Sequence, residues 1–211
     1  MANFATIVNK TLTFEGGYQA FPNDSANYTS KGDLVGTNRG ISAIAYEQYL
    51  GFPPTVTQMK AITPEIAKAV YKKLFWDKMQ GDRINSDSVA HIMFDSYIAT
   101  GSLKLSRQGI NDAGGSVDVG NIPFNNYTLS QVNSLPAQPL FEAVKQRNID
   151  NRKLLAQINP AKYGMFLQGW LNRLNAITFN DVIDAAKKNG PTIIAALFFL
   201  FGSYYIISKN K

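Results

Sequence analysis

The sequence predicts a mainly α-helical domain with a small β-hairpin, followed by a C-terminal transmembrane helix. Apolar residues recur at helical spacing along most of the 211 residues, which is typical of amphipathic helices. Strand-like patterns are sparse and confined to residues 21–41. A run of twenty residues, 189–208, carries no charge. A hydrophobic content of 45% and a charged content of 17% are those of a folded protein, and this length can bury a full core in one domain.

The first helix is expected over residues 3–15, where apolar side chains recur at helical spacing. Glu15 comes three residues after Leu12 and therefore falls at the edge of the apolar face. Gly16 and Gly17 provide the stop for the helix. A carboxyl group in this dry position is suited to donate a proton, which is the task of the general acid in glycoside cleavage.

Two further carboxylates and a hydroxyl follow Glu15 closely, namely Asp24, Asp33 and Thr37. Glycosidases need one protonated and one ionised carboxyl group around the bond that they cleave. The hydroxyl of Thr37 is suited to hold an attacking water. The predicted hairpin at 21–41 would place Asp24 and Thr37 opposite Glu15, across a cleft between two lobes.

The remaining helices are expected between clear start and stop signals. Ser86 to Thr100 is the most apolar of them and is expected to form the central core. Residues 114–127 lack a helical period and are interpreted as a loop or small hairpin. The other expected helices are Ser42 to Leu50 before Gly51, Thr63 to about Met79, Leu140 to Ile158, and Pro160 to Ala176.

Several motifs, in order along the chain, resemble glycoside hydrolase family 108, the N-acetylmuramidases of bacteria and phages. The opening motif is Glu15-Gly16-Gly17-Tyr18, then Asp24, then Thr37, Gly40 and Ile41. Later matching segments are Ala69 to Trp76, Ile92 to Asp95 with Thr100-Gly101, Gln108 to Asn111 with Tyr127 to Leu129, and Phe166 to Arg173. The resemblance covers roughly residues 3–176.

This resemblance implies a lysozyme-like, two-lobed helical fold. The implied domains are a catalytic domain at 1–104 and a peptidoglycan-binding portion at 105–176 packed on it, followed by a linker at 177–189 and the transmembrane helix at 190–208. The implied activity is hydrolysis of the β-1,4 bond between N-acetylmuramic acid and N-acetylglucosamine in bacterial peptidoglycan. Glu15 would be the general acid.

The second carboxylate remains open between Asp24 and Asp33. The family usually carries Asp-x-Gly-Gly just before the Thr, whereas Ser25 to Gly36 is longer here and lacks the Gly pair. The interval of nine residues from Glu15 to Asp24 is similar to that in phage-type lysozymes and favours Asp24. With Thr37, Asp24 would support the developing positive charge or activate a water. The substrate-binding candidates are Tyr18, Tyr28, Asp33 and Asp95.

Composition argues against several other kinds of site. The chain has no cysteine and a single histidine, His91, which lies in an apolar run. Because catalytic zinc needs several clustered ligands, we expect no metal and no cofactor. The net charge of +6 is spread over scattered Lys and Arg residues. This pattern favours anionic wall polymers or lipid headgroups as partners and does not indicate nucleic acid.

The uncharged run near the C-terminus predicts a membrane anchor at 190–208. A helix of twenty residues is about 30 Å long, which matches the apolar core of a bilayer. Tyr204 and Tyr205 suit an interface, and lysines bracket the run. A buried helix of the soluble domain is the alternative, but it fits less well because apolar residues surround the helix. Residues 1–12 show no signal-peptide pattern.

An anchored wall hydrolase of this kind suggests a phage enzyme. We therefore expect it in a virion membrane or in the host inner membrane, with bacterial peptidoglycan, lipid and other virion proteins as partners. Three alternatives remain: a catalytically weak peptidoglycan-binding virion protein, a lytic transglycosylase, and a pore-type protein in which the tail is the working part.

Overall fold

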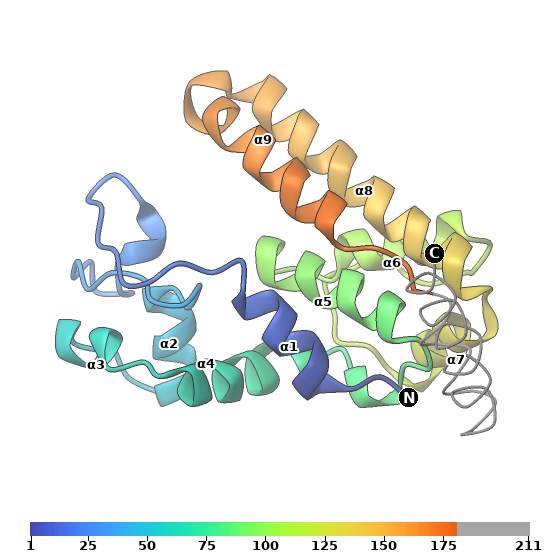
Figure 1. The fold of residues 1–211 in the computed structure, drawn as a ribbon, viewed down its shortest axis with the longest axis horizontal. Coiled ribbons are helices and arrows are strands. Elements are labelled where there is room, and N and C mark those ends of the chain that lie inside the picture. Colours follow the sequence, from blue (N-terminus) through green and yellow to red (C-terminus); the bar gives the residue numbers. More distant parts are fainter. Residues whose placement is uncertain (181–211) are drawn as a thin grey trace, which may run out of the picture. The chain divides into compact units, whose positions relative to one another are not determined.

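A computed structural model describes residues 1–180 of the chain. Residues Met1–Ile177 form one compact unit, shown in Figure 1. The α-helices of the described part are α1 (Phe4–Leu12), α2 (Ala43–Leu50), α3 (Val56–Lys60), α4 (Pro64–Tyr71), α5 (Asp87–Thr100), α6 (Lys104–Asp112), α7 (Asn126–Ser134), α8 (Ala137–Ile158) and α9 (Pro160–Ala176). The described part also contains two 3-10 turns, η1 (Ser25–Asn27) and η3 (Gly81–Arg83), and one π-helical turn, η2 (Lys72–Trp76). The prediction of a mainly α-helical domain is confirmed.

The prediction of a β-hairpin is wrong, because residues 1–180 contain no strand. The chain does double back between α1 and α2, but it pairs only at isolated antiparallel bridges such as Gln19 with Thr37 and Tyr28 with Leu34. Side chains take the place of a continuous ladder: Gln19 and Asn27 exchange two side-chain hydrogen bonds of 3.0 and 2.9 Å. The result is an irregular loop at 18–41.

Helix α1 ends three residues earlier than the predicted end at Glu15. Beyond Leu12 the backbone tightens, since the N–H groups of Thr13 and Phe14 donate to carbonyls three residues back. The Thr13 hydroxyl donates to the Lys10 carbonyl at 2.6 Å and supports this turn. Glu15 therefore lies on a turn beyond the helix, where its direction is set by the turn.

Helix α5 is the centre of the core, as predicted. Its apolar side chains are buried, including Val89, Ile92, Met93, Phe94 and Tyr97. Phe94 packs edge-on against Trp76, with ring centroids 5.4 Å apart. Trp76 is turned inward by the π-helical turn at the end of α4, where the predicted helix was expected to continue to about Met79. His91 is also buried, as expected for a packed helix residue.

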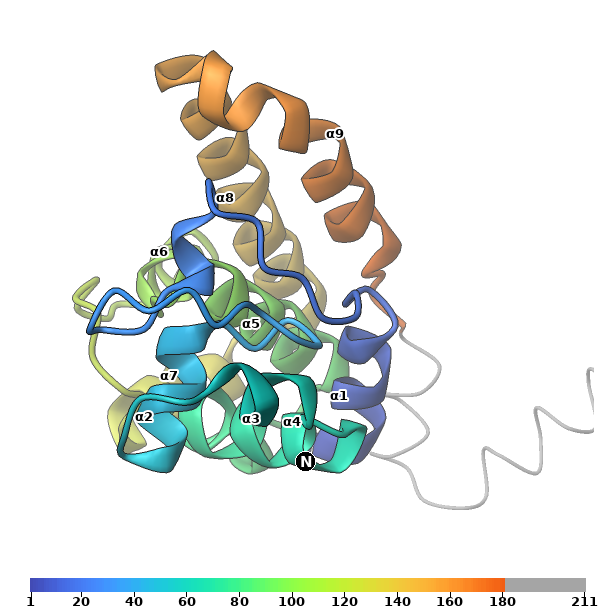
Figure 2. The same cartoon turned by 90° about the vertical axis from the view of Figure 1, so that its left-hand side faces the viewer.

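Helices α8 and α9 form a long antiparallel hairpin that packs on α5 and α6 through α8 (Figure 1). Gly109 of α6 allows this approach, because a Cβ there would overlap the backbone of Val144. Helix α9 is mostly exposed, and its last turns descend toward the end of α1 (Figure 2). Helices α3, α6 and α7 were not predicted.

No helix within residues 1–180 combines the length and apolar character needed to cross a bilayer. The predicted transmembrane helix at 190–208 and most of the predicted linker at 177–189 lie outside the described residues.

Candidate active site

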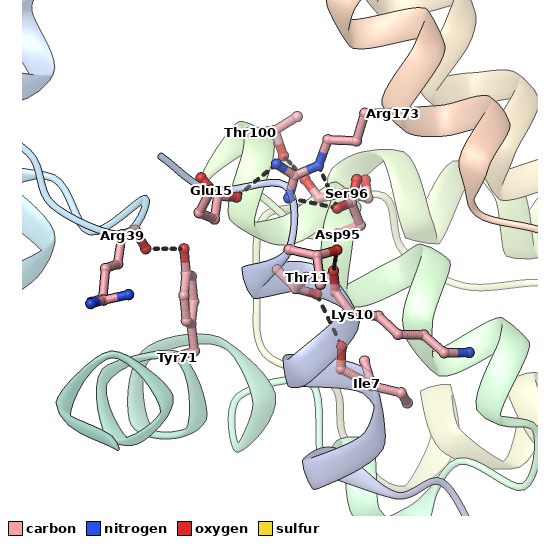
Figure 3. A network of polar contacts seen from close by, with 11 residues as sticks. Ile7, Lys10, Thr11, Glu15, Arg39, Tyr71, Asp95, Ser96, Thr100 and Arg173 are labelled. Carbon is pink, nitrogen blue, oxygen red and sulfur yellow. Dashed lines mark hydrogen bonds and ion pairs between the residues drawn. The ribbon is translucent and has the colours of Figure 1, made fainter. Parts of the chain in front are cut away.

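Glu15 lies in the interior of the domain, with its side chain only 15% exposed. Arg173, from the last turns of α9, donates from Nη1 to Glu15 Oε1 at 2.6 Å. Figure 3 shows this guanidinium reaching between two carboxylates. The guanidinium also lies over the ring of Phe14, 5.3 Å from its centroid. Glu15 is therefore held by a residue that is 158 positions away in the sequence.

The second carboxylate beside Arg173 belongs to Asp95 of α5. Its side chain is only 2% exposed, and its Oδ1 accepts a hydrogen bond of 2.8 Å from Arg173 Nε. Nη2 lies 2.8 Å from the same oxygen as an ion-pair contact without hydrogen-bond geometry. Burial lowers the pKa of Arg173, but the charges of Asp95 and Glu15 outweigh this and raise the pKa overall. Arg173 is thus a fixed cation that joins Glu15 to the core helix.

A tight turn places backbone directly against the Glu15 carboxylate. Arg39 and Gly40 have φ values of 50° and 73° and form the turn between Asn38 and Ile41, which exchange two backbone hydrogen bonds. A Cβ on Gly40 would overlap both Glu15 Oε2 and the Tyr71 hydroxyl. The positive φ also disfavours any other residue there.

Tyr71 closes the site from α4. Its hydroxyl donates to the carbonyl of Arg39 at 3.1 Å and so fixes the tight turn. Burial, and then the nearby Glu15 carboxylate, raises the pKa of Tyr71. The hydroxyl therefore stays protonated and keeps its role as a donor.

A cavity of about 280 Å³ opens beside these groups. It is lined by Glu15, Gly40, Asp95, Ile98, Ala99, Arg152, Trp170, Arg173 and Leu174. Glu15 Oε1 is occupied by Arg173, whereas Oε2 accepts no hydrogen bond from residues 1–180. Glu15 therefore lines the cavity with one carboxylate oxygen held by Arg173 and the other without a hydrogen-bond donor from residues 1–180.

The structure does not bring the other predicted catalytic residues to this cavity. Asp24 caps the turn η1, accepting from the Ala26 N–H at 3.0 Å and from the Gln19 amide at 3.3 Å. Thr37 donates to the Ala26 carbonyl at 3.4 Å. Asp33 accepts from the Thr29 hydroxyl at 3.3 Å. These three side chains are engaged within the loop at 18–41.

The predicted substrate-binding residues divide in the same way. Tyr18 donates to the Val35 carbonyl at 3.1 Å, and Tyr28 donates to the Pro22 carbonyl at 2.9 Å. Both hydroxyls are therefore satisfied inside the loop. Asp95 instead lines the cavity with Glu15. Glu15 and Asp95 are the two predicted site residues that the structure joins, through Arg173.

Comparison with known families supplies the identity of this region. The family model described as Glycosyl hydrolase 108 matches residues 8–101. The chain carries a glycosyl hydrolase 108 domain. The predicted resemblance is confirmed over residues 8–101, and a match to this family implies glycosidase activity. The match includes Glu15 and Asp95 but not Arg152 or Arg173.

Among solved structures, the chain is similar to SagA of Brucella abortus, with a TM-score of 0.68 and 22% sequence identity. The likeness covers 89% of this chain and 97% of that chain. It shows a shared fold that extends well beyond the family 108 match. No curated protein matches the sequence.

Sequence reasoning missed the basic and aromatic partners of the site. Arg173 was noted as part of a motif, but an Arg in the last turn of a helix is usually explained by the helix dipole. Tyr71 was noted in the same way, in a segment that matched the family. Trp170 lies in the same motif as Arg173, whereas Arg152 has no local signal, because the cavity that they share exists only once α8 and α9 are paired.

The described residues also bear on metal binding. Within residues 1–180, no group of three or more His, Asp or Glu side chains is placed to hold a metal ion. Burial lowers the pKa of His91 to about 4. This histidine is therefore neutral at ordinary pH and acts as a packed side chain.

Proposed function

We propose that this chain hydrolyses the β-1,4 bond between N-acetylmuramic acid and N-acetylglucosamine in bacterial peptidoglycan, with Glu15 as the general acid. One observation carries the proposal. A mostly buried carboxylate at the family 108 opening motif lines a cavity and keeps one oxygen, Oε2, without a hydrogen-bond partner in residues 1–180. A general acid needs this combination of a fixed position and a free oxygen.

In this mechanism Arg173 holds Oε1, so the transferable proton is carried on Oε2. That proton passes to the glycosidic oxygen as the bond to the anomeric carbon breaks, and the leaving sugar departs as an alcohol. Water then adds to the anomeric carbon, either directly or after a covalent intermediate. The separation of the two carboxylates distinguishes the two routes, about 5 Å for retention and 6.5–9.5 Å for inversion.

Asp24 is our first candidate for the second carboxylate, with Thr37 holding the water, and Asp33 is the alternative. All three belong to the loop at 18–41. Their side chains are satisfied within that loop. Each would therefore exchange an internal hydrogen bond for one to the substrate.

Mass spectrometry of the products released from purified peptidoglycan tests the proposal. Reducing-end N-acetylmuramic acid is the expected product. Reducing-end N-acetylglucosamine would indicate a glucosaminidase, and anhydro ends a lytic transglycosylase. Binding to the wall without any product would identify a peptidoglycan-binding structural protein.

We also propose, from the sequence, that residues 190–208 anchor the enzyme in a phage virion membrane or in the host inner membrane. The support is the uncharged run of twenty residues bracketed by lysines. A carbonate wash of membranes should leave the full-length chain in the pellet, and purified particles should contain it. Release into the soluble fraction would rule out the anchor, and absence from particles would rule out the virion role.

A further inference from the structure

A second cavity lies directly beside the one that holds Glu15. It has a volume of about 460 Å³ and is bounded by the end of α5, the start of α6, and the facing sides of α8 and α9. The two cavities share three lining residues, Ala99, Arg152 and Trp170. The two cavities are therefore neighbours, and Arg152 and Trp170 border both of them.

Arg152, on α8, is the residue that this second cavity leaves unexplained. It is only 8% exposed, and its guanidinium lies over the ring of Trp170 at 5.1 Å from the centroid. Yet it makes no hydrogen bond and no ion pair within the described part of the chain. Burying a charge without such partners is costly. Burial accordingly lowers the pKa of Arg152, because it disfavours the charged guanidinium.

The other two arginines with low exposure, Arg107 and Arg173, do have hydrogen-bond partners within residues 1–180. Arg107 donates to three backbone carbonyls, at distances between 2.9 and 3.2 Å. Arg173 holds the carboxylates of Glu15 and Asp95. Both acids of the first cavity are paired with Arg173 rather than with Arg152, and no Asp or Glu lines the second cavity. Arg152 lines both cavities and has no anionic partner at hydrogen-bond distance within residues 1–180.

The chemistry of the lining specifies the missing partner. A guanidinium fork matches a carboxylate with two parallel hydrogen bonds. Lys104 adds a second positive charge to the same cavity, and Asn151 adds an amide. The rings of Trp170 and Tyr163, with centroids 6.1 Å apart, provide apolar faces suited to a sugar or peptide. An anionic, partly apolar group fits this space.

We propose that Arg152 and Trp170 form a carboxylate-binding subsite that recognises the acidic part of a muramic acid residue next to the bond cleaved at Glu15. This inference rests on the proposed function and deepens it. The carboxylate belongs either to the lactyl group of muramic acid or to its stem peptide. The subsite selects acid-bearing wall strands over neutral glycans, and Arg152 is a binding residue that does not touch the reacting atoms.

Equilibrium binding by calorimetry tests the subsite without relying on turnover. The full-length chain carrying Glu15→Gln is titrated with soluble peptidoglycan fragments, with and without Arg152→Gln. Loss of a charge-assisted hydrogen bond should weaken binding by about tenfold or more. The matched control is Lys153→Gln, which removes the same charge at the next, exposed position and should change the affinity by less than about twofold. Equal affinities for Arg152→Gln and its control would overturn the proposal.

Changing the ligand gives a second readout that does not depend on how the Arg152 variant folds. Fragments whose carboxylates have been methyl-esterified should bind the Glu15→Gln chain about tenfold more weakly than untreated ones. Peptide-free strands, which keep the lactyl carboxylate, separate the two sources: full affinity assigns the lactyl group, and loss assigns the stem peptide. Unchanged binding of esterified fragments would overturn the subsite. Carboxylate-dependent binding by a chain that releases no products would instead refute the proposed hydrolysis alone.

Discussion

The two acidic regions at the start of the chain, the Glu15 turn and the loop at 18–41, are organised in opposite ways. Glu15 is held by a residue from the other end of the domain and faces a cavity. Asp24 and Asp33 are satisfied by neighbours within five residues of themselves. Residues that are close in sequence therefore need not converge in space. The environment of Glu15 is made by distant helices, whereas the loop is held by its own side chains.

The largest expected effect lies at Glu15. Glu15→Gln keeps the shape of the side chain and a hydrogen-bond acceptor for Arg173 but removes the transferable proton. Hydrolysis of purified walls should fall by about a hundredfold to ten-thousandfold, the range for lost general-acid help. Glu142→Gln, at an exposed position of α8, is the control and should keep wild-type turnover. Near wild-type clearing by the Glu15 variant would mean that another group donates the proton.

Arg173 provides a test of how firmly the two ends of the domain are joined. Arg173→Gln leaves Asp95 as an unpaired charge at 2% exposure, which should lower the free energy of unfolding by about 3–5 kcal/mol. Arg147→Gln breaks an ion pair whose side chains are 42% and 38% exposed and should cost at most about 1 kcal/mol. Urea denaturation of both variants measures the difference. Similar costs would mean that the Glu15 network does not stabilise the fold.

The two acids of the loop, Asp24 and Asp33, should differ strongly in their effect on turnover. Asp24→Asn should reduce turnover by about a hundredfold if it supplies the second carboxylate, with little change in stability, because Asn caps a turn about as well as Asp. Asp33→Asn should leave turnover within about threefold of wild type, since removing an exposed hydrogen bond acts mainly on stability. Initial rates and thermal melts on the same samples separate the two effects. The reverse ranking would move the second carboxylate to Asp33.

Much of the helical framework could be predicted because its ends are encoded locally. Ser42 and Ser86 each accept a hydrogen bond from the first turn of their helices, as the cap rule predicts. Gly51 ends α2 with a φ of 87°, and Pro160 opens α9. These signals act over three or four residues, so the sequence displays them directly.

The features that were missed depend on distance or on irregular backbone. Helix α3 has only five residues, too few for a periodic pattern. The π-helical turn at Lys72–Trp76 adds a residue to a helix whose apolar pattern looks continuous. At the site, the motif around Glu15 was visible, but its partner on α9 was not, since no local pattern marks an ion pair formed across the whole domain.

The separation of 158 residues between Glu15 and Arg173 also sets the order in which the enzyme is made. Ribosomes add about 5–20 residues per second, so the glutamate emerges roughly ten to thirty seconds before the arginine that holds it. Until then Asp95 has no counter-charge and the cavity has no wall from α9. A chain interrupted between residue 101 and the last turns of α9 would contain the whole family 108 segment without an assembled site. The arrangement around Glu15 is therefore complete only after Arg173 has been synthesised.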